Sequence, residues 1–303
     1  MHAQHPSPPT FPADFDAWLD RVLAEDIGAG DATTEALVPP GAAAAARIVA
    51  RTPCIVAGIP IARRLFARLD PEVRFTAGRS DGDAAGAGET VLRIEGHARA
   101  ILTGERTALN LLQRLGGIAT LTRRFVETAG PGVQVLDTRK TTPGLRWMEK
   151  YAVRCGGGAN HRAGLYDRIL IKDNHRAFWT RGDAVPLADA VRAARARHPG
   201  LPIEIEVESE AELDDALEGG PDWVLLDNMP TDRLRRCVVR TAGHARLEAS
   251  GGVTLETVAT IAATGVDAVS VGALTHSAPS VDLSLEFEGA TPCPSDPATP
   301  AGM

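Results

Sequence analysis

Cysteine is scarce in this 303-residue sequence, and its scarcity excludes two classes of protein. The four cysteines lie far apart and form no CxxC pair: Cys54, Cys155, Cys237 and Cys293. Such spacing fits neither a disulfide framework nor a cysteine-based zinc site. We therefore expect reduced thiols, as in a cytoplasmic protein.

Long apolar runs and an excess of positive charge are also missing. No stretch is long and apolar enough to predict a membrane span, and the N-terminus lacks the basic and apolar regions of a signal peptide. The 32 Lys and Arg residues are outnumbered by 39 Asp and Glu residues, which gives a formal net charge of -7. Because binding to a phosphate backbone needs a basic surface, this charge argues against nucleic acid as the main partner. The sequence predicts a soluble, cytoplasmic protein.

The composition allows one large domain or two smaller ones, since 44% of the residues are hydrophobic. The Pro-rich ends, residues 1–12 and 290–303, predict disordered tails. Residues 13–116 alternate short strands and helices, which predicts an α+β unit around a small antiparallel sheet. Its acidic, Gly-rich stretch 25–34 fits a structural turn better than a metal site, because no spacing there matches a calcium loop.

A long helical pattern begins at His97 and continues to about Val126. Gly116-Gly117 interrupts it, which predicts a break in the helix. On its polar face lies Arg106, for which the sequence alone favours a surface ion pair.

From residue 117 to 278 the pattern becomes a regular alternation of strands and helices, which predicts a parallel sheet. The predicted strands are 133–138, 168–172, 203–208, 223–227, 246–250 and 268–272. About six strands are fewer than the eight of a complete barrel, so we expect an incomplete α/β barrel, with an open doubly wound sheet as the alternative. The segment 279–289 alternates in polarity and is predicted to return as a strand of the N-terminal domain.

Polar and glycine residues follow each predicted strand of this second domain. Because the carboxyl ends of parallel strands meet at one face, these residues are expected to share one site. They are of three chemical kinds: cations (Arg139, Lys140, Arg162 and Lys172, with His161), carboxylates (Glu206 and Asp227), and turns that expose backbone N–H groups (Ser250 to Gly252, Gly272 and Ala273). Cations bind carboxylates or phosphates, carboxylates suit sugar hydroxyls or Mg2+, and the two turns suit a phosphate.

Three residues near the predicted strand ends allow another interpretation when each is considered alone. His161 and His276 are isolated histidines, which are more often structural than ligands, and Lys172 could form a Schiff base. Neither GxGxxG nor GxxxxGK[ST] occurs, which excludes dinucleotide-binding and P-loop sites of those types.

A series of motifs occurs in order along the chain. The motifs are Glu25-Asp26-Ile27-Gly28, Gly30-Asp31-Ala32-Thr33-Thr34, Gly104-Glu105-Arg106-Thr107, Asp137-Thr138-Arg139-Lys140, Gly156 to Arg162, Ile171-Lys172-Asp173-Asn174-His175, Glu204-Ile205-Glu206-Val207, Leu226-Asp227-Asn228-Met229, Glu248 to Gly252, and Ser270 to His276. Together they make the chain resemble the quinolinate phosphoribosyltransferases, the carboxylating nicotinate-nucleotide pyrophosphorylases. The resemblance extends from about Phe15 to Phe287 and shows no departure at the motif positions.

The resemblance implies an architecture and a set of site residues. It implies an N-terminal α/β sandwich domain, a six- to seven-stranded incomplete barrel, and a homodimer or dimer-built hexamer in which Arg106 is donated across the interface. The implied substrate-binding residues are Arg106, Thr138, Arg139, Lys140, His161, Arg162, Lys172, Glu206, Asp227, Ser250, Gly251, Gly252, Gly272, Ala273, Leu274 and His276. Lys140, Glu206 and Asp227 are implied to be catalytic, and the two carboxylates are implied to hold Mg2+ directly or indirectly.

The activity implied is transfer of phosphoribosyl from 5-phosphoribosyl 1-pyrophosphate to quinolinate, with loss of CO2, as a step of NAD biosynthesis. Such a reaction needs positioning and fixed charge rather than a protein nucleophile. Three alternatives stay open: a pyrophosphorylase of the same fold acting on a monocarboxylate such as nicotinate, a Schiff-base aldolase using Lys172, and a phosphate-sugar binding protein without turnover.

Overall fold

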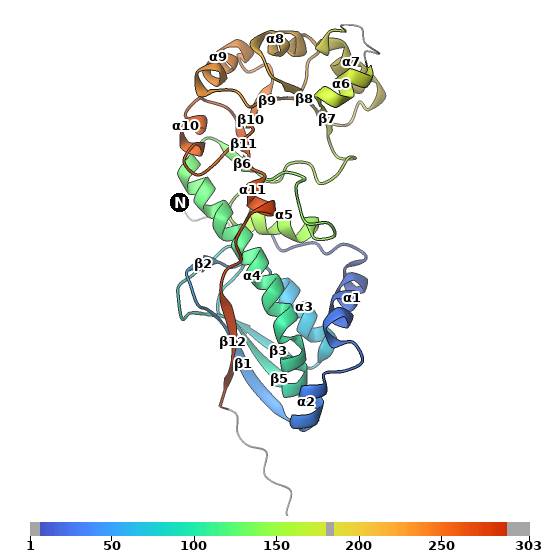
Figure 1. Ribbon diagram of the computed structural model, residues 1–303, viewed down its shortest axis with the longest axis vertical. Coiled ribbons are helices and arrows are strands. Elements are labelled where there is room, and N and C mark those ends of the chain that lie inside the picture. The colour runs from blue at the N-terminus through green and yellow to red at the C-terminus, as the bar shows by residue number, and fades with distance from the viewer. Residues whose placement is uncertain (1–6, 180–184, 290–303) are drawn as a thin grey trace, which may run out of the picture. The chain divides into compact units, whose positions relative to one another are not determined.

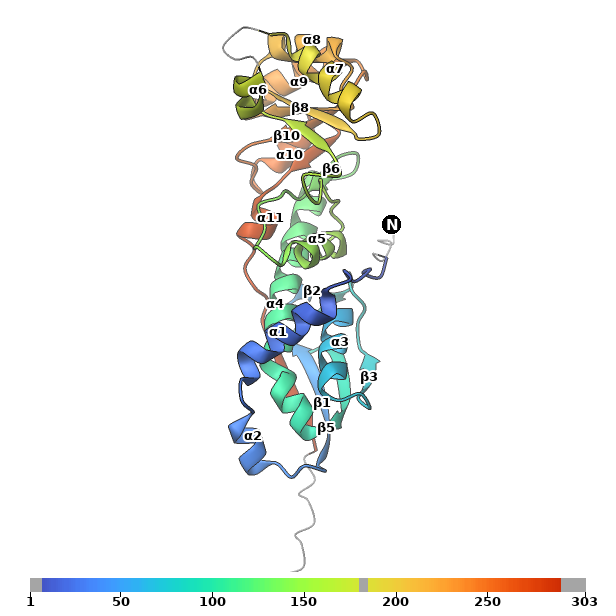
Figure 2. The same ribbon diagram turned by 90° about the vertical axis from the view of Figure 1, so that its right-hand side faces the viewer.

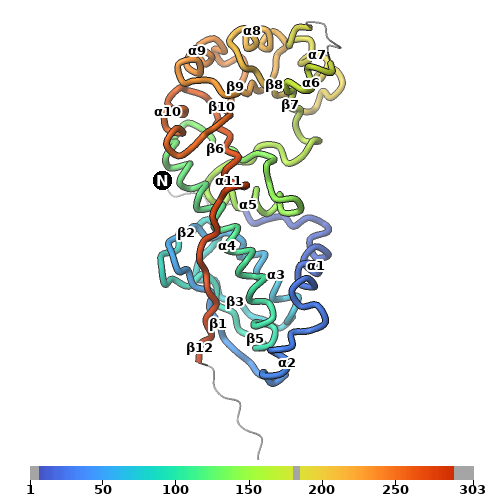
Figure 3. The backbone as a smooth tube through the Cα atoms, viewed as in Figure 1, coloured from blue at the N-terminus to red at the C-terminus, as the bar shows by residue number. Residues whose placement is uncertain are grey.

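The computed structural model describes residues 7–179 and 185–289 and divides them into two compact units (Figure 1). The first unit contains the chain up to Gly117 together with the segment from Ser280 onward, and the second contains Ile118–Pro279. Figure 3 traces the backbone of each unit as a tube. Of the predicted tails, only residues 7–12 lie within the description, and Phe11 already packs against Phe15 with ring centroids 4.4 Å apart. The remaining tail residues lie outside the described chain, and their disorder stays a prediction.

The first unit is built on a four-stranded antiparallel sheet with the order β12-β1-β5-β3. Its elements are α1 (Phe15–Ile27), α2 (Ala32–Leu37), β1 (Ala43–Ala50), β2 (Cys54–Ile55), α3 (Ile59–Leu69), β3 (Arg74–Ala77), β4 (Ala84–Ala85), β5 (Thr90–His97), the first part of α4 (Ala98–Ala129), and β12 (Leu283–Glu288). β2 and β4 form a separate pair. Strand β12 pairs antiparallel with β1, with Ala46 opposite Phe287, so the end of the described chain lies in this sheet.

Carboxylate side chains cap the starts of two of these helices. Asp31 caps α2, because its side chain accepts the N–H of Thr34 at 3.0 Å. The carboxylate of Asp81 accepts the N–H groups of Gly58 and Ile59 at the start of α3, each at 3.0 Å. The acidic stretch 25–34 thus contains a helix start, and Asp31 also accepts a hydrogen bond from the hydroxyl of Thr103. These contacts agree with a structural function for that stretch.

Helix α4 is continuous across Gly116-Gly117, so the predicted break is wrong. A Cβ atom on Gly116 would lie 2.8 Å from Cγ2 of Val281, which means that the glycine makes room for a neighbouring segment. The flanking Leu115 and Ile118 are buried and supply the helical stripe. A glycine within a helix can mark close packing as well as an end, and only the structure distinguishes the two.

The second unit alternates strands and helices. Its elements are β6 (Gln134–Leu136), α5 (Arg146–Cys155), β7 (Ile169–Ile171), α6 (Asp173–Trp179), α7 (Leu187–Arg197), β8 (Ile203–Val207), α8 (Glu210–Glu218), β9 (Trp223–Asp227), α9 (Thr231–Thr241), β10 (Arg246–Ser250), α10 (Val258–Ala262), β11 (Ala268–Ser270) and α11 (Ala273–His276). All six predicted strands are present, each within two residues of its predicted bounds. Figure 2 shows α7, α8 and α9 along the outside of the sheet, and neighbouring helices of this series pack against each other.

The strand order identifies this unit as an incomplete α/β barrel. The six parallel strands have the order β6-β11-β10-β9-β8-β7, so the first strand lies beside the last and the order never reverses. A doubly wound sheet would contain a reversal, which excludes that alternative. On the free side of β6, Ala159 forms an isolated parallel bridge to Leu136. Among the described residues no ladder joins this side to β7, and the barrel stays open there.

Two further expectations concern the whole chain. Cys54, Cys155 and Cys237 are buried, whereas Cys293 lies outside the described residues. Within the described chain, no helix has both the length and the apolar character required to cross a bilayer. The cytoplasmic location stays a prediction.

Candidate active site

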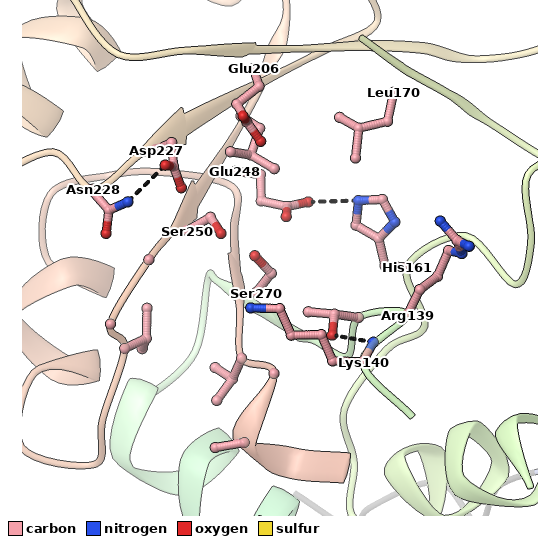
Figure 4. Close-up of a pocket in the computed structure, with 18 of the residues that line it drawn as sticks. Arg139, Lys140, His161, Leu170, Glu206, Asp227, Asn228, Glu248, Ser250 and Ser270 are labelled. Atoms are coloured by element: carbon pink, nitrogen blue, oxygen red, sulfur yellow. Dashed lines mark hydrogen bonds and ion pairs between the residues drawn. The ribbon is translucent and has the colours of Figure 1, made fainter. Parts of the chain in front are cut away.

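A cavity of about 850 Å³ lies at the carboxyl ends of the barrel strands (Figure 4). All of its lining residues belong to the second unit. Paired residues of parallel strands point to the same face, and the lining residues follow that rule. Glu206 is opposite Leu225, Leu225 is opposite Glu248, and Ser250 is opposite Asp227. The alternation along each strand therefore points these side chains into the barrel.

The structure brings together most of the residues predicted to form the site. The following line the cavity: Thr138, Arg139, Lys140, His161, Arg162, Lys172, Glu206, Asp227, Ser250, Gly251, Gly252, Gly272, Ala273 and His276. Leu274 is not among the lining residues, since its side chain is buried in the core, and its proposed part in the phosphate turn, through the backbone, stays a prediction. Arg106 belongs to the first unit, where it is exposed on α4, and no hydrogen bond or ion pair to another described residue engages its side chain.

Two arginines give the cavity uncompensated positive charge. The Nε atom of Arg139 is buried and has no hydrogen-bond partner among the described residues. Burial, and then the neighbouring charge of Arg139, lower the pKa of Arg162. The positive charges of the two guanidinium groups repel each other, and an anion between them would offset this repulsion. A carboxylate can accept two parallel hydrogen bonds from one guanidinium group. The pair is therefore chemically suited to bind an anion.

Lys172 adds a third cation, but in a different setting. Its Nζ lies 2.7 Å from Oε2 of Glu206, with which it forms an ion pair. An amine engaged in this way is suited to binding anions, whereas a Schiff base requires a free amine. The Lys172–Glu206 pair thus gives no support to the aldolase alternative.

His161 has a setting that the sequence did not predict. Its Nδ1 accepts the N–H of Arg162 at 2.7 Å, so the ring proton must lie on Nε2. That Nε2 faces Oε2 of Glu204 at 2.9 Å and Oε2 of Glu248 at 3.4 Å, and Figure 4 shows the ring directed toward Glu248. Both ring nitrogens are engaged within the protein, so in this geometry His161 forms a wall of the cavity, and its ring nitrogens are not free to bind a substrate anion.

The cluster of His161, Glu204 and Glu248 is buried, and its potential ligand atoms lie within 4.8 Å of one another. The hydrogen on Nε2 prevents this nitrogen from acting as a metal ligand. Burial, and then the charge of Glu204, raise the pKa of Glu248 well above its usual value. Burial also opposes the ionisation of Glu204, but hydrogen bonding from His161 and the charges of His161 and Arg168 lower its pKa overall. The pKa values of the two buried carboxyl groups are therefore shifted in opposite directions, with the imidazole of His161 beside both.

Glu206 and Asp227 are the residues of the cavity that could hold a metal ion. Asp227 ends β9, Glu206 is the penultimate residue of β8, and both are partly exposed and line the cavity. Asp227 accepts a hydrogen bond from the side chain of Asn228 at 2.7 Å, which orients one oxygen and leaves the other available. Mg2+ commonly takes one or two carboxylates together with substrate oxygens, and this donor set fits that pattern.

Glycines after β10 and β11 allow two turns to approach the cavity closely. Gly251 has φ +97°, and a Cβ there would lie 3.0 Å from the backbone nitrogen of Asn228. A Cβ on Gly272 would lie 3.1 Å from Nε2 of His276 and 3.2 Å from Cδ of Lys140. Both positions therefore require glycine for space, and Gly251 also requires it for its backbone conformation. Turns after the last two strands are the usual phosphate position in α/β barrels.

Several lining residues were missed by the sequence analysis. Leu170, Leu225, Glu248 and Ser270 each precede a predicted site residue by two positions on the same strand. Because side chains alternate along a strand, counting back two residues from each strand end would have found them. Asn228 was also missed, although it has φ 52°, a conformation that a residue other than glycine adopts mainly at special positions.

These features define a class of protein: an α/β barrel with an anionic ligand held at the carboxyl ends of its strands, between arginines, carboxylates and glycine turns. Two family models narrow the class. Residues 31–116 match the N-terminal domain, and residues 118–286 the C-terminal domain, of quinolinate phosphoribosyl transferase. The chain belongs to this family.

Individual relatives agree with the match. The chain is 44% identical to a probable nicotinate-nucleotide pyrophosphorylase [carboxylating] of Bacillus subtilis, over 88% of this chain and 91% of that protein. It is also 44% identical to the nicotinate-nucleotide pyrophosphorylase [carboxylating] of Mycobacterium leprae, over 90% and 98%. Among solved structures, NadC from Streptococcus pyogenes is similar with a TM-score of 0.87 and 39% identity, over 93% of this chain and 100% of that one.

Proposed function

We infer that this chain transfers phosphoribosyl from 5-phosphoribosyl 1-pyrophosphate to quinolinate, releasing pyrophosphate, CO2 and nicotinate mononucleotide. The names of its relatives state this activity. For this chain, the inference rests on the pair Arg139 and Arg162, which line the same cavity. The Nε–H of Arg139 is buried and has no hydrogen-bond partner among the described residues. A dicarboxylate matches such a pair better than a monocarboxylate does.

Quinolinate is held, in this proposal, at the side of the cavity formed by the loops after β6 and Ala159. Arg139 and Arg162 bind its carboxylates, with Thr138 and Lys172 beside them. His161 contributes its ring to the wall of the cavity beside them. The geometry of the unpaired Arg139 Nε and the shared lining of one cavity support this arrangement.

The phosphoribosyl donor is held on the opposite side of the cavity. The turns Ser250 to Gly252 and Gly272 to Ala273 bind the 5-phosphate with His276, and Glu206 and Asp227 bind the ribose hydroxyls and Mg2+. When bound, Mg2+ would neutralise charge on the pyrophosphate. Lys140 lies next to Gly272, whose missing side chain gives it room, so its ammonium group is available to both substrates.

The chemistry follows from this placement. The quinolinate nitrogen attacks C1 of the ribose as the bond to pyrophosphate breaks, and C1 passes through oxocarbenium character. Glu206 and Asp227 supply negative charge near the developing cation, and Lys140 supplies positive charge near the leaving group. The ring nitrogen is then quaternary, so the adjacent carboxylate can leave as CO2, because the resulting carbanion is stabilised by the positive nitrogen. That ring carbon then takes up a proton, from Lys140 or from water, to give nicotinate mononucleotide. Aligning the two substrates is the main contribution of the protein.

We also propose that two copies of the chain complete the site, with Arg106 donated by one copy to the cavity of the other. An exposed arginine on α4 without a partner among the described residues supports this, because its guanidinium group is available to a second copy. Dimers and hexamers built from dimers both satisfy the proposal.

Direct binding measurements test whether Arg139 and Arg162 form an arginine clamp that binds the carboxylates of quinolinate. Calorimetric titration of the protein with quinolinate and, separately, with nicotinate should show tighter binding of the dicarboxylate. Replacing Arg139 by alanine should weaken quinolinate by about 1.5–3 kcal/mol or more, the loss of a charge-assisted hydrogen bond, and affect nicotinate less. Equal affinity for both acids in the unmodified protein would instead favour the monocarboxylate alternative.

A further inference from the structure

A buried ion pair outside the cavity connects the two loops that carry the arginine clamp. Asp137, at the end of β6, is fully buried, and its carboxylate accepts hydrogen bonds from Lys150 Nζ on α5, from Asn160 Nδ2 at 2.5 Å and from the backbone N–H of His161 at 2.9 Å. None of Asp137, Lys150 and Asn160 lines the cavity. Contact with a substrate therefore does not account for the network.

Lys150 and Asn160 extend the connection to the backbone. Lys150 Nζ also donates to the carbonyl oxygen of His161 at 3.0 Å, and Asn160 Nδ2 donates to the carbonyl oxygen of Lys150 at 2.9 Å. Both the N–H and the C=O of His161 are thus held by this one ion pair. Arg162 follows His161 directly, and Arg139 lies two residues after Asp137. The same few atoms fix the backbone just before each guanidinium group.

Stability alone does not account well for such a pair. Burial raises the pKa of Asp137 and lowers the pKa of Lys150, despite the attraction between the two groups, so each charge is costly in this position. Buried ion pairs can often be replaced by apolar residues with little loss of stability. What an apolar pair could not provide is the set of hydrogen bonds to the backbone of His161.

We propose that Asp137 and Lys150, with Asn160, are positioning residues that set the separation of Arg139 and Arg162 and thereby the affinity for the dicarboxylate substrate. The inference rests on the proposed function, because it concerns the quinolinate side of that site. It predicts that changes in the network affect the binding of one substrate and not of the other. Disturbing the network weakens quinolinate, while the phosphoribosyl donor, held by the turns after β10 and β11, is bound as before.

The test compares Michaelis constants for both substrates in four variants. Asn160→Ala removes two hydrogen bonds and keeps the ion pair, so it should fold normally and raise the KM for quinolinate several-fold. Lys150→Met should raise it by about tenfold, the size expected for lost hydrogen bonds to the clamp loop, and should lower the melting temperature because the Asp137 charge is left buried. In both, the KM for 5-phosphoribosyl 1-pyrophosphate should change by less than about twofold on the same reasoning.

The double variant Asp137→Asn with Lys150→Met separates positioning from stability. It leaves no unpaired charge, so its melting temperature should recover toward that of the unmodified protein, while the KM for quinolinate stays raised. Asp215→Asn is the matched control, because Asp215 accepts the N–H groups of Leu187 and Ala188 in the outer helical layer and does not line the cavity. Asp215→Asn should lower the melting temperature without selectivity between the substrates.

Three outcomes would overturn the inference. Recovery of the quinolinate KM together with the melting temperature in the double variant would show that the pair acts through stability. Parallel increases in both Michaelis constants would show the same. Absence of quinolinate turnover in the unmodified protein would overturn the proposed function and, with it, this inference, whereas the first two outcomes leave the proposed function intact.

Discussion

The unpartnered Nε atom of Arg139 makes this residue the sharpest test of the anion site at the level of single residues. Lysine keeps the charge but cannot donate two parallel hydrogen bonds to a carboxylate. Arg139→Lys should therefore raise the KM for quinolinate by about tenfold to a hundredfold, equivalent to about 1.5–3 kcal/mol. Arg235→Lys, an exposed arginine on α9, is the control and should leave kinetics unchanged. A normal KM in Arg139→Lys would mean that a point charge suffices there.

Glu248 should make the stability of the protein depend on pH. Its pKa in the folded protein is well above the usual 4.5, so the folded state holds a proton that the unfolded chain releases. The associated stability is fully present below the unfolded pKa and is lost as pH rises through the folded pKa. Glu248→Gln cannot ionise, so its melting temperature relative to the unmodified protein should increase from acidic to alkaline pH.

Thermal unfolding followed across this pH range measures the difference. The control is Glu218→Gln, which changes an exposed side chain at the end of α8 and should show no pH-dependent difference. A constant difference between Glu248→Gln and the unmodified protein at all pH values would mean that Glu248 is ionised in the folded state. His161 would then face two carboxylates, an arrangement that favours a charged imidazolium over the neutral tautomer.

At the level of elements, the turn after β10 gives the clearest prediction. Gly251 has φ +97°, and a Cβ there would approach the backbone nitrogen of Asn228 to 3.0 Å, so alanine must displace the turn. Gly251→Ala should raise the KM for 5-phosphoribosyl 1-pyrophosphate by about tenfold or more, since the backbone donors to the phosphate move, and should change quinolinate affinity less. Gly200→Ala, a glycine with open space and no positive φ, is the control and should behave normally.

The elements also show which features a sequence can predict. The six barrel strands and the position of the site followed from short apolar runs, each ended by a polar or glycine residue, because strand period and strand-end chemistry are local. The continuity of α4 could not be predicted, because whether Gly116 ends a helix or admits Val281 depends on packing between distant segments.

The setting of His161 could not be predicted either, because its ring is held by Arg162, Glu204 and Glu248 together. Leu274 was assigned to the site by its motif, but the burial of its side chain is a tertiary property.

At the level of the whole molecule, the shared site predicts complementation between inactive variants. Arg106→Ala and Arg139→Ala should each be nearly inactive, since each removes a guanidinium group from the proposed quinolinate site. If Arg106 is donated across the interface, a mixed dimer contains one site with both arginines intact, so activity should reappear when the two variants are unfolded and refolded together. Size-exclusion chromatography of each variant alone checks that assembly is unchanged. No recovery on mixing would place Arg106 and Arg139 in the same copy's site.

The central claim is that the arginine clamp and the phosphate turns of one cavity serve a decarboxylating phosphoribosyl transfer. The most direct measurement supplies the purified protein with Mg2+, 5-phosphoribosyl 1-pyrophosphate and either quinolinate or nicotinate, and quantifies mononucleotide and CO2. We expect equal amounts of nicotinate mononucleotide and CO2 from quinolinate, no turnover of nicotinate, and loss of activity when a chelator removes Mg2+. Turnover of nicotinate, or formation of mononucleotide from quinolinate without CO2, would contradict the account.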